Sequence, residues 1–477
     1  MPHAITASGM SRLRTAVVAA RRALSSATPC PLWLDDPSAP PAETPLDGTR
    51  NADLVIVGGG LSGLWGAVVA KESWPDLDVV ILEASRIASG ASGRAGGIVS
   101  TSLMHGLTNE ARVFPRDIAV LERLGMENLQ AVRSAIERYR IECQVEWTGE
   151  MKVAASADRV AYLQEEFELH VRHGHDVVML GRDELRAHIR SPLMHAGMWS
   201  RQRSGIINPA RLAWGLRRAA LRLGVRIHET SPVRSLRQEA DRVRIRTERG
   251  EIRALRVLLA TNAWSGVLPA VRNRVLTAHD QVLATEPLTA GQLASVGWRF
   301  RQGIYDTRTQ LNYMRLTSNN RIVFGGHVGY FFNNAIDPKE DRDVQSFTAL
   351  ATTFTETFPQ LEDVRVTHVW GGPIDYCKRV AMFFQRFLQG RAIWVGGYSG
   401  FGVAASRFGA ATALDILFER RTCATSLDIA TTFPGGIPGE PLRWLGATLT
   451  NYALARADRS AGWQRVVNFM RMLGYPL

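Results

Sequence analysis

Hydrophobic residues recur along this chain at two spacings, one typical of buried strands and the other of amphipathic helices. Residues 54–57 form a continuous apolar run, and a second predicted strand at residues 78–82 is apolar after Asp78, as strands buried on both faces are. Helical spacing is clearest at residues 61–71, 113–139, 159–173, 209–223, 344–358 and 403–420. Shorter strand-like runs lie at residues 225–228, 232–237, 242–247, 256–260, 311–316, 321–325 and 392–395. Strand and helix alternate from residue 54 onward, which predicts an α/β fold.

The first 51 residues depart from this pattern. No acidic residue precedes Asp35, and apolar residues share one helical face with arginines nearby, namely Leu13, Val17, Ala20 and Leu24 with Arg12, Arg14, Arg21 and Arg22. Four prolines in residues 35–51 predict an extended linker. An organelle transit peptide has a similar start. We favour a frayed surface helix or a disordered tail.

Composition and charge narrow the class of protein. The chain has 477 residues, of which 45% are hydrophobic and 21% charged, as in a soluble globular protein of two or three domains. Its apolar runs are too short to cross a membrane. The net charge of +12 comes almost wholly from arginine, and apolar spacing interrupts the basic stretches. We therefore expect no nucleic acid partner and at most a weak association with anionic surfaces.

The four cysteines, Cys30, Cys143, Cys377 and Cys423, are far apart and form no C-x-x-C pair. This spacing argues against a structural zinc site and against a disulfide framework. We expect no metal, and a reducing cytoplasm as the location.

A glycine-rich turn, G-G-G-L-S-G, joins the first predicted strand to the first predicted helix. In this G-x-G-x-x-G spacing, Gly58 permits the tight turn, Gly60 lets the backbone approach a pyrophosphate, and Gly63 lets helix and strand pack closely. The N–H groups at the helix start then face the phosphates. Glu83 follows Gly63 by 20 residues, where a carboxylate accepts hydrogen bonds from ribose hydroxyls. These features predict a dinucleotide site.

A second loop of small residues, S-G-A-S-G-R-A-G-G at residues 89–97, follows the second strand, and its backbone can lie against a flat ligand. A nicotinamide dinucleotide has no evident need of it. Here the chain resembles the FAD-dependent amine and amino-acid oxidoreductases, a family that includes D-amino acid oxidase, glycine oxidase, sarcosine oxidase and γ-glutamylputrescine oxidase. Their loop commonly reads G-A-S-G-R-N-G-G, and Ala95 replaces its asparagine here. The resemblance implies that the dinucleotide is FAD.

Further landmarks of this family occur in order at residues 205–209, 224–225, 231–233, 259–264, 370–372 and 395–403. In relatives the last of these forms a turn and a helix N-terminus that approach the flavin carbonyls, where positive dipole ends are favourable. The resemblance spans about residues 52–420. It implies that FAD is held by Gly58, Gly60, Leu61, Ser62, Gly63, Glu83, Ala84, Ser92, Gly93, Arg94, Gly96, Gly97, Val233, Thr261, Asn262, Trp264, Gly397, Tyr398, Gly400, Phe401, Gly402 and Val403.

The family fold implies a Rossmann-like FAD-binding domain that is discontinuous in sequence, at residues 52–110, 195–268 and 366–420. A second, mixed-sheet α+β substrate domain would comprise residues 111–194 and 269–365. Residues 1–51 would be an extension with a linker, and residues 421–477 a helical tail.

Three positions differ from patterns common in the family. Phe401 stands where the last turn often has a histidine, which removes a titratable group beside the flavin. Ile374 stands where amino-acid-oxidising relatives have the arginine that pairs with the substrate carboxylate, which argues against a simple α-amino acid. Some relatives attach FAD through a cysteine near the position of Trp370, and Cys377 comes seven residues later. We therefore expect non-covalent FAD.

The candidate catalytic residues are Tyr313, Arg315 and His105. Tyr313 and Arg315 alternate on one predicted strand, so both could face the substrate cavity, with Arg315 taking an anionic group. The alternative is a surface strand with a solvated arginine. Tyr305 is a weaker candidate of the same kind. His105 could reach the flavin ring, although such a histidine is more often a hydrogen-bonded loop residue.

The resemblance implies oxidation of a C–N bond in a small amine or amino acid by hydride transfer to flavin N5, giving an imine. O₂ or a carrier would then accept the electrons. Two alternatives stay open. One is a flavoprotein that oxidises another small molecule in a biosynthetic or catabolic pathway, and the other is an RNA- or membrane-associated flavoprotein.

Overall fold

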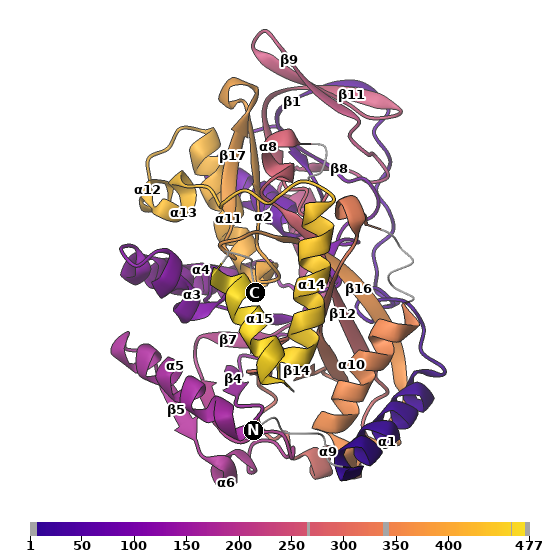
Figure 1. Ribbon diagram of the computed structural model, residues 1–477. Coiled ribbons are helices and arrows are strands. Elements are labelled where there is room, and N and C mark those ends of the chain that lie inside the picture. The colour runs from indigo at the N-terminus through magenta and orange to yellow at the C-terminus, as the bar shows by residue number, and fades with distance from the viewer. Residues whose placement is uncertain (1–6, 265–267, 337–342, 459, 473–477) are drawn as a thin grey trace.

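The computed structural model describes residues 7–264, 268–336, 343–458 and 460–472, and these form two large sheets with helices packed around them (Figure 1). The ends of the predicted N-terminal extension and C-terminal tail, and short pieces of both predicted domains, lie outside the described residues.

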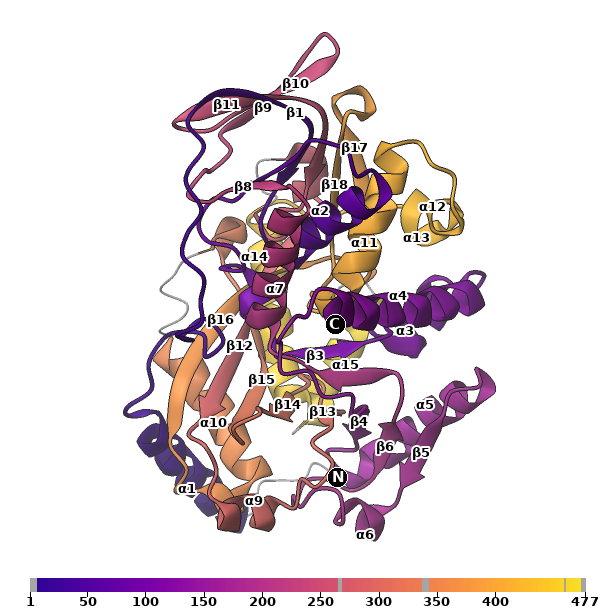
Figure 2. The ribbon, with the colours of Figure 1, turned by 180° about the vertical axis from the view of Figure 1, so that it is seen from behind.

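The first sheet carries the strand that precedes the glycine-rich turn. Its strand order is β17 (Phe383–Phe387), β18 (Ala392–Gly396), β11 (Gly250–Leu259), β1 (Gly48–Val57), β2 (Val79–Leu82) and β8 (Arg226–His228). The strands from β18 to β8 are parallel, as the continuous apolar runs predict. A hairpin of β9 (Ser235–Glu239) and β10 (Arg242–Arg246) pairs with β11. The helices α2 (Leu61–Ser73), α7 (Pro209–Arg222), α11 (Gly402–Leu417) and α4 (Ile118–Arg138) pack together beside this sheet (Figure 2).

The second sheet is mixed and lies in the other half of the molecule. Its order is β16 (Val366–Tyr376), β12 (Leu276–Thr285), β15 (Ile322–Tyr330), β14 (Tyr313–Leu316), β13 (Gly303–Asp306), β4 (Glu150–Val153), β6 (Gly197–Ser200) and β5 (Val177–Leu180). The pair β13–β4 is parallel and the other neighbours are antiparallel. A two-stranded sheet of β3 (Ile98–Ser100) and β7 (Ser204–Ile206) completes the set. The fold therefore has the predicted parallel sheet and the predicted mixed sheet.

The remaining helices lie mostly around the second sheet and at the C-terminal end. They are α1 (Ala7–Leu24), α3 (Gly106–Val113), α5 (Val160–Arg172), α6 (Arg182–Leu185), α8 (Pro269–Arg272), α9 (Ala290–Val296), α10 (Val344–Thr357), α12 (Cys423–Ser426), α13 (Asp428–Thr431), α14 (Leu442–Ala457) and α15 (Ala461–Met472). Within the described ranges, no helix is both long enough and apolar enough to span a bilayer.

The prediction of one helix over residues 113–139 was wrong. The chain forms α3, ends it at Val113, and begins α4 at Ile118. Pro115 lies in the break, because a proline disfavours the helical conformation of the residue before it and lacks the N–H that a helix interior needs.

The N-terminal segment is also more ordered than a frayed helix or a disordered tail. Helix α1 packs against α10, and Ala20 on α1 is fully buried. After α1 the chain runs along the second sheet, where Thr28 and the β16 residues Thr367 and Val369 exchange backbone hydrogen bonds. Trp33 is then buried at 3% exposure. Residues 25–47, which we call the N-terminal strap, therefore pack against the folded body.

Candidate functional site

A single cavity of about 770 Å³ collects the sequence motifs at the junction of the two sheets. It is lined by the turn after β1, the end of β2, the second glycine loop, the segment before β9, the end of β11 and the turn before α11. Residues from β12 to β16 of the second sheet close its other end. Its size is within the usual range for cofactor and substrate pockets.

The glycine turn after β1 has no room for side chains. Gly58 has φ +111°, and a Cβ there would lie 2.5 Å from the carbonyl oxygen of Ala260. A Cβ on Gly63 would lie 1.9 Å from the carbonyl oxygen of Gly58. The turn therefore brings bare backbone and the N-terminus of α2 to the cavity, an arrangement that suits a phosphate group.

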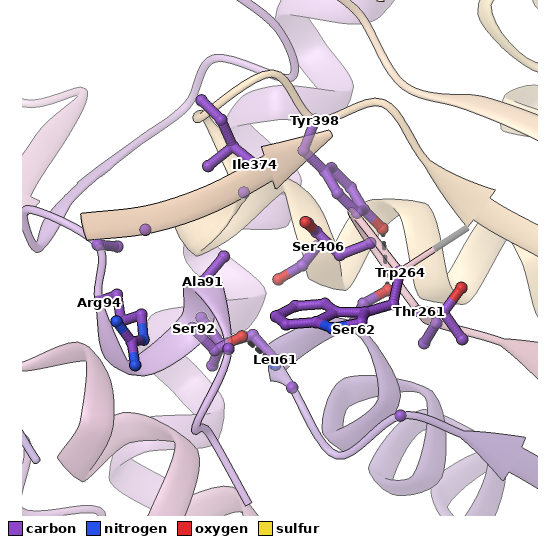
Figure 3. A pocket seen from close by; sticks show the side chains of 18 of the residues that line it. Leu61, Ser62, Ala91, Ser92, Arg94, Thr261, Trp264, Ile374, Tyr398 and Ser406 are labelled. Carbon is purple, nitrogen blue, oxygen red and sulfur yellow. Dashed lines mark hydrogen bonds between the residues drawn. The ribbon is translucent and has the colours of Figure 1, made fainter. Parts of the chain in front are cut away.

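The N-terminus of α2 is joined to the second glycine loop. The N–H of Leu61 donates to Ser92 Oγ at 2.8 Å, and Ser62 Oγ lies 2.9 Å from Tyr398 Oη (Figure 3). Three segments far apart in the sequence thus meet around one helix end. Trp264 extends between this end and Ala91, and its side chain is half-exposed.

The carbonyl groups of the second loop are tied to side chains. Trp370 Nε1 donates to the carbonyl of Arg94 at 2.9 Å, and Trp33 Nε1 of the N-terminal strap donates to the carbonyl of Ala95 at 2.8 Å. Because C=O and N–H point in opposite directions in a trans peptide, the next N–H groups face the other side of the loop. The second loop therefore has carbonyl groups on the face that meets Trp33 and Trp370 and N–H groups on its other face.

At the end of β2, Glu83 lines the cavity. Its carboxylate accepts the N–H of Gly59 at 2.6 Å and the N–H of Ser85 at 2.8 Å. Burial raises the pKa of Glu83, while these N–H donors act in the opposite direction. Val233 lines the same end of the cavity. The turn, the helix end and the carboxylate fit the phosphate and ribose parts of a dinucleotide.

The turn before α11 is held from beneath by Asp375, a residue that sequence reasoning did not single out. Asp375 is buried, and its carboxylate accepts the N–H of Gly397. Burial raises the pKa of Asp375 to about 7. The turn leads directly into α11, so the helix N-terminus is presented at the cavity wall.

The other end of the cavity is rich in aromatic groups. Tyr305, Tyr313, Tyr376 and Phe401 line it, together with His105, Ile374 and Asp280. His105 is partly buried; its Nε2–H donates to the carbonyl of Ser399, and its ring lies 4.2 Å from that of Phe401 between centroids. Burial lowers the pKa of His105 to about 4, so the imidazole is neutral at neutral pH.

The structure brings most of the predicted cofactor residues to the cavity. Gly58, Gly60, Leu61, Ser62, Glu83, Ala84, Ser92, Arg94, Gly96, Gly97, Val233, Thr261, Asn262, Trp264, Tyr398, Gly400, Phe401, Gly402 and Val403 line it. Three predicted glycines do not line it. Gly63 packs on Gly58, Gly93 on Ala88 and Leu34, and Gly397 on Phe383, so they shape the loops from behind.

Of the catalytic candidates, Tyr313 and His105 line the cavity and Arg315 does not. Arg315 is fully buried, and its NH1 donates to the carbonyls of Gly97 at 3.0 Å and Ile207 at 2.6 Å. It therefore supports the second loop from below. The prediction that it takes an anionic group in the cavity was wrong, and so was the alternative of a solvated surface arginine.

Cys377 is buried with its Sγ against the carbonyl of Ala381, and it does not line the cavity. All four cysteines are free. The described ranges contain no cluster of three or more His, Cys, Asp or Glu side chains placed to bind a metal ion.

Besides Asp375, sequence reasoning missed Asp280, Tyr376 and Trp33. Asp280 lies in the middle of β12, which reads L-T-A-H-D-Q-V-L-A-T, and its place as the one carboxylate of that strand was the available signal. Tyr376 ends β16 two residues beyond Ile374 and shares its face. Trp33 was a single aromatic residue in a segment interpreted as a tail, and nothing near it in the sequence indicated its contact with Ala95.

Comparison with known proteins agrees with this geometry. The model of a family described as FAD dependent oxidoreductase matches residues 53–414. Gamma-glutamylputrescine oxidoreductase of Escherichia coli is 32% identical over 365 residues, which are 76% of this chain and 82% of that protein. A probable oxidoreductase, OrdL, of Haemophilus influenzae is 30% identical over 369 residues, 76% of this chain and 81% of that protein.

Solved structures show the same fold at lower identity. Glycine oxidase from Geobacillus kaustophilus superposes with a TM-score of 0.64 at 18% identity, covering 78% of this chain and 96% of that enzyme. The family match spans most of the chain and includes both sheets. This chain therefore belongs to the family of FAD-dependent oxidoreductases, the DAO family.

Proposed function

We propose that this protein oxidises the C–N bond of a small amine, using FAD that is bound without a covalent link. The observation that carries the proposal is the continuity of one cavity from the dinucleotide turn at Gly58 to the aromatic end at Tyr305 and Tyr313. When bound, FAD supplies the hydride acceptor, and the resulting imine is hydrolysed by water. Relatives named gamma-glutamylputrescine oxidoreductase and sarcosine oxidase subunit beta support an amine as substrate.

The residues of this chain bind and orient the cofactor and the substrate, and they exclude water from the reacting atoms. The turn at Gly58 and the N-termini of α2 and α11 supply N–H groups and positive dipole ends. The second loop, with its carbonyls held by Trp33 and Trp370, supplies a rigid wall. The aromatic end removes water from the reacting carbon, and neutral His105 adds no charge there. This chemistry needs orientation more than an acid–base triad.

Several finer features belong to the same proposal. Cys377 points away from the cavity, which supports non-covalent FAD. The electron acceptor is O₂ or a carrier. Four free cysteines favour a reducing compartment, and we propose the cytoplasm. The charge of +12 supports at most a weak attraction to anionic surfaces.

An anaerobic titration of the purified protein tests the proposal. We expect a yellow protein whose flavin absorption bleaches on addition of one member of a panel of polyamines, N-methyl amino acids and imino acids. The amount required gives the stoichiometry. A protein that binds FAD but is not bleached by any of the panel would instead support the oxidation of another class of small molecule. A colourless protein that cannot be reconstituted with FAD would contradict the proposal.

A further inference from the structure

Asp280 places a carboxylate in the aromatic end of the cavity. It lies on β12 opposite Gly372 of β16, and both residues line the cavity. Burial raises the pKa of its carboxyl, and hydrogen bonds from the hydroxyl of Tyr313 and the N–H of Gln281 act in the opposite direction. No ion pair joins Asp280 to another residue among those that the structure describes. A carboxylate without a cationic partner in a pocket lined by aromatic side chains is costly, which makes a cationic ligand a favourable neighbour.

Tyr313 is built into position beside this carboxylate. Its hydroxyl donates to Asp280 Oδ2 at 2.5 Å. Its ring is wedged between two glycines: a Cβ on Gly96 would lie 2.2 Å from the ring, and a Cβ on Gly325 would lie 2.1 Å from it. Gly96 belongs to the second loop and Gly325 to β15. The pair of Asp280 and Tyr313 is therefore fixed against the loop that the family uses for the flavin.

The cations of the cavity wall are directed elsewhere. Among the described residues that line it, Arg94 and Arg234 carry positive charge. Arg94 donates from Nε to the carbonyl of Ser89 at 3.0 Å and from NH1 to the carbonyl of Gly371 at 2.7 Å. Arg234 pairs with Glu248, beside the segment that meets the ribose end. Ile374 takes the place of a carboxylate-binding arginine, and it faces the flavin turn at Gly400.

We propose that Asp280, oriented by Tyr313, is the subsite that binds the ammonium group of the substrate, so that the protein accepts cationic amines and excludes substrates with a carboxylate at this position. This assignment rests on the proposed amine oxidation and names its substrate class. An ammonium group can donate hydrogen bonds to the free lone pairs of the Asp280 carboxylate, and charge-assisted bonds of this kind are the stronger ones. The reacting nitrogen must be neutral when a hydride leaves its carbon, so the bound ammonium first passes one proton to the Asp280 carboxylate. A substrate carboxylate would meet Asp280 as a like charge without a compensating arginine.

Two inert probes that share a tert-butyl group and carry opposite charges test the assignment without turnover. The tert-butylammonium ion and pivalate differ in charge, and neither has a hydrogen on the carbon that bears the charged group, so neither can lose a hydride there. Binding of each to the FAD-loaded protein is measured by the perturbation of the flavin spectrum and by calorimetry. We expect the wild type to bind tert-butylammonium at least about tenfold more tightly than pivalate, as a charge-assisted hydrogen bond implies.

Matched variants test which residue causes the preference for tert-butylammonium over pivalate. Asp280→Asn removes the charge at nearly constant shape and should abolish the preference. Tyr313→Phe should weaken it less, and the control Tyr305→Phe removes a hydroxyl from the same end without touching Asp280 and should preserve the ratio. Equal affinities for both probes in the wild type, or an undiminished preference in an FAD-loaded Asp280→Asn protein, would overturn the assignment. A wild type that never binds FAD refutes the proposed function instead, and this outcome is visible before any probe is added.

Discussion

At the scale of single residues, the backbone of Gly58 leads to a prediction about cofactor binding. Its φ of +111° is strained for other residues, and a Cβ would lie 2.5 Å from the carbonyl oxygen of Ala260. We expect Gly58→Ala to lower FAD affinity at least about tenfold, because a shift of more than 1 kcal/mol is usual for such strain. Fluorescence titration of the apoprotein with FAD measures this. Gly291→Ala is the control, because a Cβ added at Gly291 would have no atom within 4 Å outside its own helix. This variant should leave FAD affinity unchanged.

Asp280 makes a pH dependence predictable at the same scale. Burial raises its pKa from the ordinary 3.8 to about 7, whereas the pKa values of its neighbours Tyr313 and Tyr376 are raised above their usual range and that of His105 falls to about 4. Only the deprotonated carboxyl attracts a cation, so affinity for tert-butylammonium should rise from pH 6 to pH 8. Asp280→Asn should give a flat profile over that window.

The same shift has a consequence for stability. A pKa raised in the folded state means that folding favours the protonated carboxyl. The contribution of Asp280 to the free energy of unfolding is therefore present at low pH and is lost as the pH rises through about 7. We expect Asp280→Asn to melt above the wild type at pH 8 and to lose this advantage towards pH 4. A thermal melting series over this range measures the difference, and a difference of opposite sign would contradict the assigned shift.

At the scale of elements, the N-terminal strap stabilises the second glycine loop. Trp33 Nε1 donates to the carbonyl of Ala95, and the Arg315 guanidinium lies 5.2 Å from the Trp33 ring centroid while it donates to the carbonyl of Gly97. One residue of the strap thus contacts the loop directly and also packs on a second residue that holds it.

We expect Trp33→Ala to cost about 3–5 kcal/mol of unfolding free energy, the usual range for a buried tryptophan, and to weaken FAD binding. Trp33→Phe keeps the packing and loses the hydrogen bond, so it should cost about 1 kcal/mol. Urea unfolding and FAD titration measure both effects. Trp444→Ala, at a site with 37% exposure outside the loop, is the control for removing an indole. Equal costs at Trp33 and Trp444 would show that the strap has no such role.

At the scale of the whole molecule, the cavity joins the two sheets. Its lining comes from β1, β2 and β11 on one side and from β12 to β16 on the other, so FAD bound there would contact segments of both sheets. A ligand at 100 times its Kd stabilises the folded state by about 2.7 kcal/mol. We therefore expect FAD to raise the melting temperature of the apoprotein. Gly58→Ala should show a much smaller rise at the same FAD concentration.

Local chemistry explains why some features could be predicted and others could not. The strand, turn, helix and acid of the dinucleotide site lie within residues 54–83, so their spacing alone carries the information. The break before α4 could have been predicted from Pro115 alone. The domain boundaries stay a prediction, because the described sheets alone do not test where each segment changes domain.

The roles of Arg315 and Asp280 could not be predicted, because their partners are distant in the chain. Arg315 and Tyr313 share one face of β14, as alternation predicts, yet only Tyr313 lines the cavity. The second loop passes over that face, so Arg315 meets the carbonyl of Gly97 and is covered. The proposed role of Asp280 depends on its hydrogen bond with Tyr313, which lies on another strand.

The amino-acid sequence by itself determined the dinucleotide turn, the second loop and the alternation of strands and helices, because each depends on neighbours within one or two elements. Only the tertiary structure decided which side chains reach the aromatic end of the cavity, how Trp33 supports the second loop, and why Arg315 is a support. These outcomes depend on how strands from both sheets pack across one cavity, and that packing joins residues hundreds of positions apart.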